Sequence, residues 1–254
     1  MSGDITLIDG GAGAVRRLVR AASGLFGRPG FGPAALVGGL AVTVRLATLH
    51  RATNDVDVVS EGDAPLEYVG EGDAQGSNRI EIDGVTVDVM LTSPLPPTAE
   101  ELPDRDLDRL FVLGHRWALE SAEPLVVRVV AASESGPGDA HALVVATATA
   151  LVACKFHAIA DRRDAGRDKR ESDALDLVRL IGDLVRTPPS AAQFETAPFD
   201  LAALVSLQTQ RWLIENSTRT ARLINMSAGG GDVTMNPADI ATIGELFVEM
   251  LTAR

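Results

Sequence analysis

A short apolar stretch runs straight into two consecutive glycines, and this junction limits the possible folds more than any other part of the chain. Residues 35–37 are typical of a buried strand, Gly38-Gly39 of a tight turn, and the residues up to about Leu49 of a helix. A strand that passes directly into a helix leaves unpaired N–H groups and the positive end of the helix dipole beside the turn, which favours phosphate. Taken alone, a Gly-Gly pair before a helix is more often a packing device than a phosphate site.

Two carboxylates follow on the next predicted strand. Asp55 and Asp57 are two residues apart in the run NDVDVV, so both side chains should project from the same face of a sheet. Like charges side by side destabilise a strand unless a cation or solvent separates them. Mg²⁺ prefers carboxylate oxygens together with substrate phosphates, so the pair predicts a metal site beside Gly38-Gly39. A solvated edge strand is the alternative for an isolated Asp-x-Asp.

A third carboxylate, Asp88, strengthens the metal hypothesis. The runs RIEI and VTVDVML flank Asp83-Gly84, a hairpin signal, and Asp88 interrupts the second run where a hydrophobic residue is expected. We expect the hairpin to bring Asp88 beside Asp57. Three converging carboxylates suit two-metal phosphoryl or nucleotidyl transfer, with Asp88 as the base or as a ligand of the second metal.

These motifs resemble the signature of the nucleotidyltransferase superfamily with the polymerase-beta-like fold, in its AbiEii and MenT toxin branch. The resemblance covers about residues 35–185. It rests on a Gly-Gly helix start, an Arg-x-Thr-x-Asp-x-Asp strand, a lysine on a later helix and two aspartates on the helix after it. In this chain the matching residues are Gly38, Gly39, Ala41, Arg51, Thr53, Asp55, Asp57, Lys155, Asp173 and Asp176.

The resemblance implies a Mg²⁺-dependent enzyme that moves a nucleoside monophosphate from an NTP to a hydroxyl, with a tRNA 3′ end as acceptor. It also implies a toxin that is paired with an antitoxin protein. Asp55, Asp57 and Asp88 would be the metal ligands, and the same three with Lys155 the catalytic residues. The implied nucleotide-binding residues are Gly38, Gly39, Arg51, Thr53, Lys155, Asp173 and Asp176. Ser172 stands before Asp173 where the family has lysine and aspartate in sequence, which leaves the role of that helix open.

Lys155 also stands out without the resemblance. It is one of two lysines in the chain and follows the apolar run 142–154, so its ammonium is expected at the edge of a buried helix. A triphosphate could be its counter-ion. A side chain that extends from the core to solvent explains the same pattern.

Composition narrows the choice of acceptor and partner. The net charge of −12 argues against a surface built as a whole for nucleic acid. A small-molecule nucleotidyltransferase of the antibiotic-modifying kind fits this acidity better, and a non-catalytic nucleotide-binding or antitoxin-like protein is a further alternative. The run 142–154 is shorter than the roughly 20 residues that cross a bilayer, and the N-terminus lacks signal-peptide features, so we expect a cytoplasmic protein without a membrane segment.

The overall pattern predicts an α+β protein in two parts. A mixed sheet with helices, the nucleotidyltransferase domain, is expected over residues 1–132, and an all-helical domain over 139–254, separated by the run SESGPGD. Predicted helices cover 12–26, 141–162, 171–186, 200–226 and 237–253. Cys154 lies within the second of these helices, where packing is expected rather than nucleophilic chemistry.

Overall fold

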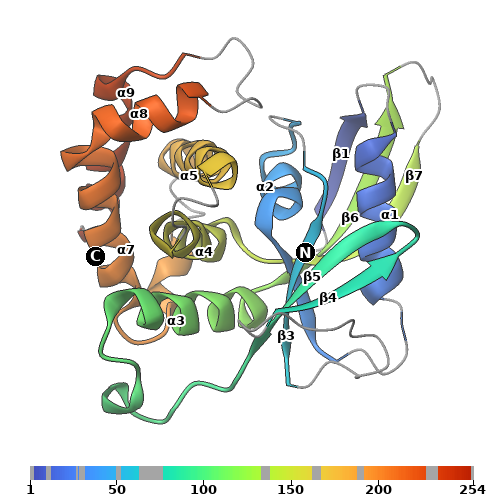
Figure 1. The fold of residues 1–254 in the computed structure, drawn as a ribbon, viewed down its shortest axis with the longest axis horizontal. Helices are drawn as coiled ribbons and strands as arrows, with labels where there is room; N and C mark the ends of the chain where they lie inside the picture. Colours follow the sequence, from blue (N-terminus) through green and yellow to red (C-terminus); the bar gives the residue numbers. More distant parts are fainter. Residues whose placement is uncertain are drawn as a thin grey trace. The chain divides into compact units, whose positions relative to one another are not determined.

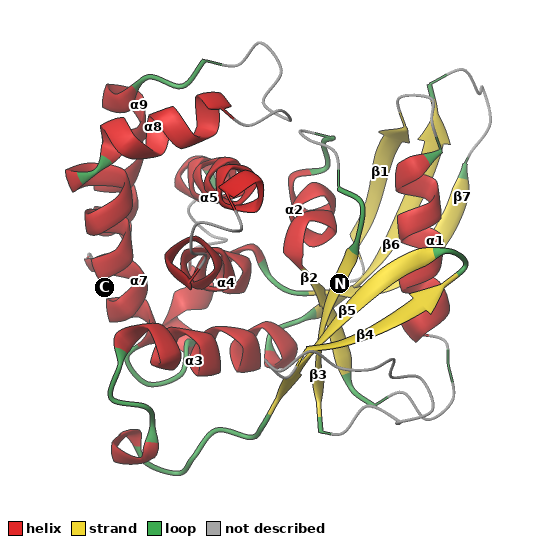
Figure 2. Cartoon of the chain, viewed as in Figure 1, coloured by secondary structure: helices red, strands yellow, loops and turns green. Residues whose placement is uncertain are grey.

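The chain forms an α+β structure whose contacts divide it into two units. The computed structural model describes residues 3–9, 13–26, 28, 32–49, 53–62, 77–132, 138–161, 167–187, 192–226 and 234–252. Unit 1 comprises residues 1–94 and 118–147, and unit 2 comprises residues 95–117 and 148–254. Figure 2 shows the described strands within unit 1, whereas unit 2 is helical.

Unit 1 is built on a mixed sheet that has seven strands among the described residues, in the order β1-β6-β7-β2-β3-β5-β4 (Figure 1). The β1–β6, β7–β2 and β3–β5 pairs are parallel, and the other neighbours are antiparallel. The strands are β1 (Gly3–Asp9), β2 (Ala34–Val37), β3 (Val56–Glu61), β4 (Ser77–Ile82), β5 (Val85–Thr92), β6 (Glu123–Ala131) and β7 (Asp139–Val145). The predicted α+β class with a mixed sheet is therefore confirmed.

Two helices belong to this sheet. Helix α1 (Ala14–Phe26) contacts strands along most of the sheet and buries Leu18, Val19 and Leu25, the apolar stripe that the sequence predicted. Helix α2 (Gly38–Leu46) starts where β2 ends and contacts β2 and β3. The predicted order of strand, Gly-Gly turn and helix is confirmed, although α2 ends at Leu46 rather than near Leu49.

The predicted hairpin is confirmed and its turn is well defined. Asp83 and Gly84 both have positive φ, 51° and 72°, as a two-residue type I′ turn requires. Ile82 therefore pairs with Val85, and this fixes every later pair of the β4–β5 ladder. Val85, Val87 and Val89 form the buried face of β5.

Unit 2 packs its helices around a separate apolar core that includes Phe156, Leu175, Leu213 and Phe247. Within the described residues its helices are α3 (Asp106–Glu120), α4 (Ala148–Asp161), α5 (Arg167–Arg186), α7 (Leu201–Thr209), α8 (Ser217–Met226) and α9 (Pro237–Thr252). The last turn of α3 is counted with unit 1. Unit 2 also contains two short 3₁₀ segments, Ala99–Glu101 and Ala192–Thr196. None of the helices in the described ranges combines the length and the apolar composition needed to cross a membrane.

The predicted helix over residues 141–162 is wrong in its first third. The chain continues as β7 to Val145, pairs with β6 and enters α4 only at Ala148. Alternate residues Leu143 and Val145 are buried, whereas Val144 between them is half-buried and Ala142 before them is exposed. A run of alanine, leucine and valine fits a buried helix and a strand equally well, so periodicity could not separate them.

The unit boundaries differ from the predicted division at 132 and 139, in part because residues 139–145 form a strand rather than a helix. Strand β7 belongs to the sheet, so the first unit extends to Thr147, and residues 95–117 with most of α3 belong to the helical unit. The sequence also gave no prediction of β1, which lies at one edge of the sheet beside β6.

The predicted helix over 200–226 is interrupted. Residues Gln210–Glu215 form a π-helical segment between α7 and α8. Gly244 of α9 lies against this segment, and a Cβ at Gly244 would come within 2.8 Å of the Leu213 Cβ. The close approach explains a glycine in the middle of a helix.

Candidate functional site

Three carboxylates of unit 1 lie together beside the start of α2. One carboxylate oxygen from each of Asp55, Asp57 and Asp88 lies within 4.8 Å of the other two, and all three residues are half-buried. Asp57 and Asp88 are direct register partners on the parallel strands β3 and β5, and Asp55 immediately precedes β3. The predicted convergence of these three residues is therefore confirmed.

Asp88 lies on a different face of its strand from the one the sequence suggested. The buried face of β5 is formed by Val85, Val87 and Val89, and Asp88 belongs to the other, half-buried face. It therefore does not take the place of a core residue. Its carboxylate is partly open to water, which makes a charged state at this position far less costly than burial would.

Gly38 explains how Asp57 comes so close to helix α2. Its φ is +68°, a left-handed conformation that favours glycine, and a Cβ at this position would overlap the Asp57 carboxylate. Val37, the residue before it, is the register partner of Asp57. Gly38 thus makes room for a carboxylate at the N-terminus of α2, in addition to its predicted role in holding phosphate.

The backbone at this helix start has no side-chain cap. Val37 occupies the N-cap position and forms no side-chain hydrogen bond to the first turn of α2. The first N–H groups of a helix and its dipole favour negative charge. Asp57 lies against Gly38 in this first turn, so the predicted phosphate position at Gly38-Gly39 is adjacent to the three carboxylates.

The predicted nucleotide-binding residues before β3 are only partly described. Thr53 donates from Oγ1 to Asp55 Oδ1 over 3.4 Å, which orients this carboxylate from within its own loop. Arg51 lies outside the described residues.

Arg79 is a site residue that the sequence analysis missed. Its Nε donates to Asp88 Oδ1 at 2.7 Å and its Nη2 to Oδ2 at 3.4 Å. The signal was present in the hairpin: a two-residue turn at Asp83-Gly84 makes Arg79 the register partner of Asp88. Arg79, Asp88 and Asp57 therefore form one cross-strand row over β4, β5 and β3.

The donor set fits a divalent cation that prefers oxygen ligands. Oxygens that share one Mg²⁺ ion at about 2.1 Å lie about 3–4 Å apart, so small rotations of the three side chains would bring them into position. Carboxylates of this kind hold metal ions while leaving positions for substrate oxygens. The three aspartates could thus hold a metal ion.

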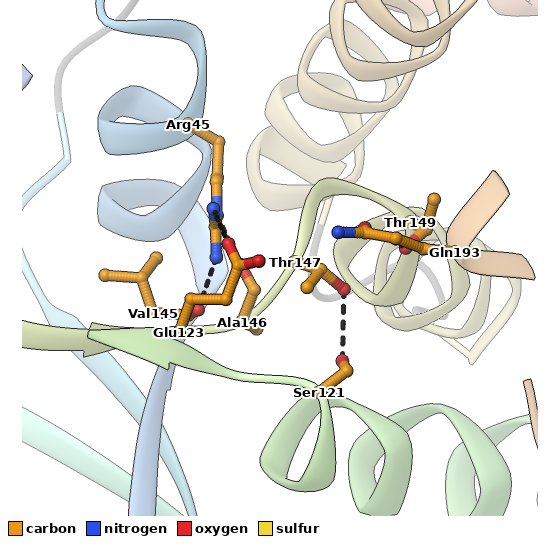
Figure 3. A network of polar contacts seen from close by, with 8 residues as sticks. All are labelled: Arg45, Ser121, Glu123, Val145, Ala146, Thr147, Thr149 and Gln193. Atoms are coloured by element: carbon orange, nitrogen blue, oxygen red, sulfur yellow. Dashed lines mark hydrogen bonds and ion pairs between the residues drawn. The ribbon is translucent and has the colours of Figure 1, made fainter. Parts of the chain in front are cut away.

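Helix α2 is fastened at its other end by Arg45. This side chain donates from Nε to the Ala146 carbonyl at 2.7 Å, from Nη2 to the Val145 carbonyl at 2.6 Å, and pairs through Nη1 with Glu123 (Figure 3). Its side chain is 14% exposed. A cation in the last turn also suits the helix dipole. Arg45 therefore ties α2 to the end of β7, and so supports the helix that carries Gly38.

Figure 3 also draws two residue pairs near the end of β7 and the start of α4, each joined by a side-chain hydrogen bond. Ser121 and Thr147 share a hydrogen bond of 3.0 Å within unit 1. Within unit 2, Thr149 donates to Gln193 Oε1 at 3.1 Å, which joins the first turn of α4 to a 3₁₀ segment.

Lys155 lies in unit 2, where two buried aspartates neutralise it. Its Nζ is 2.7 Å from Asp173 Oδ1 and 2.7 Å from Asp176 Oδ2, with the three side chains 5%, 5% and 0% exposed. Asp173 and Asp176 are three residues apart and share one face of α5. The interpretation of Lys155 as a side chain that reaches solvent is therefore wrong, and its role toward a triphosphate stays a prediction.

Two other chemistry-bearing groups of unit 2 lie in its core. Burial raises the pKa of the Cys154 thiol to about 12, which disfavours the thiolate and supports the predicted packing role. His115 and His157 form a ring cluster with Phe111, and His115 hydrogen-bonds through Nδ1 to the Phe111 carbonyl. Burial lowers the pKa of His115 to about 4, so this ring is neutral near pH 7.

Comparison of the chain with known protein families, with curated proteins and with solved structures finds no match.

Proposed function

We propose that this chain is a metal-dependent nucleotidyltransferase that moves a nucleoside monophosphate from an NTP to an acceptor hydroxyl. The convergence of Asp55, Asp57 and Asp88 beside the uncapped start of α2 carries the proposal. Carboxylates that hold Mg²⁺ and a helix start that binds phosphate are the parts that such a reaction needs in one place. The polymerase-beta-like fold and its toxin branch, which the sequence motifs resemble, belong to the same proposal.

In the proposed reaction the three aspartates and the two glycines of the candidate site have distinct tasks. Asp55 and Asp57 would hold Mg²⁺, which would supply charge neutralisation and orientation at the phosphate groups. The N–H groups at Gly38 and Gly39 bind the triphosphate. The acceptor oxygen forms a bond to the α-phosphorus, and the bond from that phosphorus to the bridging oxygen breaks. Pyrophosphate leaves with the electron pair, and Asp88 accepts the hydroxyl proton.

We further propose a tRNA 3′ end as acceptor and a role as the toxin of a toxin–antitoxin pair, both on the strength of the motif resemblance. Lys155, Asp173 and Asp176 enter this proposal as the motif residues of a later helix. A small-molecule acceptor is the second candidate, because a chain of net charge −12 attracts polyanions poorly. A non-catalytic nucleotide-binding partner is the third alternative, and a turnover assay separates it from the other two.

Transfer of label from NTPs tests the proposal directly. The full chain is incubated with α-labelled NTPs, Mg²⁺ and either total cellular RNA or a panel of hydroxyl-bearing small molecules. Label in RNA supports the tRNA acceptor, and label in a small molecule supports the second candidate. Asp83→Asn is a suitable control, since it removes a carboxylate from the hairpin turn of the same unit and asparagine tolerates its positive φ.

Binding provides an assay that needs no acceptor. Mg²⁺ together with NTP should raise the Tm of the protein by mass action. The rise should shrink in Asp57→Asn and persist in Asp83→Asn. Equal rises in all three proteins would place the nucleotide elsewhere. The proposal fails if no acceptor is labelled and Mg²⁺ with NTP leaves the Tm unchanged.

A further inference from the structure

A salt bridge to Arg79 already engages both oxygens of the third carboxylate of the site. The two contacts, 2.7 Å to Oδ1 and 3.4 Å to Oδ2, place the guanidinium side-on against Asp88. In the proposed function Asp88 either binds a metal ion or accepts a proton. Each task brings a positive charge to oxygens that already lie against the Arg79 guanidinium.

The two partners differ in how freely they can move. The Arg79 side chain is 65% exposed and lies on β4, an edge strand, whereas the Asp88 side chain is 15% exposed on the inner strand β5. An arginine on an edge strand has solvent beside it, and an ion pair with so exposed a partner contributes little to stability. Asp88 instead lies beside Asp57, its register partner on β3.

The charges of the cross-strand row Asp57, Asp88 and Arg79 explain why an arginine lies beside Asp88. Asp57 and Asp88 are register partners and repel each other, and Arg79 is the register partner of Asp88 on its other side. The guanidinium therefore offsets repulsion between two carboxylates, as a divalent cation would. Because both are cations near the same oxygens, they oppose each other's binding.

We propose that Arg79 is an internal counter-ion that competes with the divalent cation for Asp88 and so sets the cation concentration at which the site loads. Arg79 is a positioning residue in this scheme, since it acts through Asp88. The inference rests on the proposed function, because it takes the three carboxylates as the cation site.

Titration of the full-length protein with Mn²⁺, followed by electron paramagnetic resonance of the free ion, tests the competition without any turnover. We expect Arg79→Gln to bind Mn²⁺ about tenfold more tightly than wild type, since a unit charge a few ångströms away is removed. Arg79→Lys keeps the charge and loses the two-pronged contact, so its affinity should lie between the two. Nuclear magnetic resonance of the Arg79 Nε–H group should show a shift on addition of Mg²⁺ to wild type and none in Asp57→Asn.

Arg20→Gln is the matched control. Arg20 belongs to the same unit, is 73% exposed and lies 3.9 Å from Asp83, a carboxylate outside the candidate site. This variant makes the same change in net charge, but Arg20 pairs with Asp83 rather than with a carboxylate of the candidate site. Its Mn²⁺ affinity should therefore stay within about twofold of wild type, because water and salt screen exposed charges.

The outcomes separate the two proposals. Unchanged or weaker Mn²⁺ binding in Arg79→Gln, with binding that Asp57→Asn abolishes, overturns the competition and leaves the metal site standing. Equal tightening in Arg79→Gln and Arg20→Gln also overturns it, since net charge alone would then explain the effect. Binding that Asp57→Asn does not reduce overturns the proposed metal site and the competition together.

Discussion

Two clusters of aspartates with a cation lie among the described residues, one in each unit, and they differ in burial. Asp55, Asp57 and Asp88 of unit 1 are half-buried, and Asp88 pairs with the exposed Arg79. Asp173 and Asp176 of unit 2 are buried and meet the buried Lys155 at 2.7 Å. A buried charge requires a fixed partner, whereas a half-buried charge can exchange its partner for water or an ion. Burial therefore distinguishes the first cluster, whose carboxylates could hold a metal ion, from the second, which is part of a core.

The largest expected effect is the loss of transfer in Asp57→Asn. Removal of a metal ligand should lower the rate of nucleotidyl transfer by roughly ten thousandfold, as the loss of an essential catalytic group does elsewhere. The Tm without metal should be equal or higher, because Asp57 and its register partner Asp88 no longer repel each other. Rate and melting measurements on this variant and Asp83→Asn check both statements, and turnover at the wild-type rate would remove the metal assignment.

Lys155→Met, in contrast to Asp57→Asn, should lower the stability of the protein. It leaves two buried carboxylates without this ammonium, so the free energy of unfolding should fall by about 3–5 kcal/mol. Urea unfolding measures the change, and Lys169→Met, at an exposed lysine of the neighbouring helix, should alter stability by less than about 0.5 kcal/mol.

A double variant sharpens this test. Asp173→Asn should destabilise Lys155→Met less than it destabilises wild type, because the carboxylate that it removes has already lost its partner. Wild-type stability in Lys155→Met, together with weaker NTP binding, would show that the ammonium serves a triphosphate rather than the core.

The pH dependence of unit 2 should reflect its buried histidine. His115 has a pKa near 4, chiefly through burial, with a hydrogen bond to the Phe111 carbonyl opposing this and nearby His157 adding to it. In the unfolded chain its pKa is about 6.5, so the unfolded state binds more protons between these values. Stability is complete above pH 6.5 and falls as the pH is lowered toward 4, by about 3 kcal/mol.

His115→Gln removes this titration. The unfolding free energy of the variant, measured from pH 7 to pH 4, should fall less steeply than that of wild type. Parallel curves for the two proteins would mean that His115 does not contribute to the slope.

The smallest expected effect is a difference in stability between alanine variants of two glycines that have the same backbone conformation. Gly38→Ala and Gly84→Ala both place a Cβ at positive φ, +68° and +72°, at a cost of about 1–2 kcal/mol. At Gly84 the added Cβ would have no atom within 4 Å, whereas at Gly38 it would overlap Asp57. We expect Gly38→Ala to cost about 1–3 kcal/mol more and to weaken Mn²⁺ binding, while Gly84→Ala leaves binding unchanged.

Equal losses of stability in these two alanine variants, with Mn²⁺ binding intact in both, would show that Asp57 does not depend on the space at Gly38.

Short-range signals predicted the candidate site well. The Asp83-Gly84 turn determines the register of its hairpin, so the contact between Arg79 and Asp88 could also have been derived from the sequence. The pairing of Asp57 with Asp88 joins strands that are distant in the chain, and the sequence suggested it through the chemistry of three carboxylates rather than through any local rule. The helix–strand error at residues 141–145 arose because alanine, leucine and valine satisfy both patterns when the segment is buried.

The sequence by itself determined the elements whose residues carry their own conformational reasons: the strand that ends at Gly38, the amphipathic α1 and the type I′ hairpin. Only the tertiary structure decided which charges are buried. Lys155 follows an apolar run and Asp88 interrupts one. Lys155 of α4 is nevertheless buried against α5, whereas Asp88 of β5 is partly exposed to solvent. The exposure of a side chain depends on what packs against it from distant parts of the chain, and a local pattern does not contain that information.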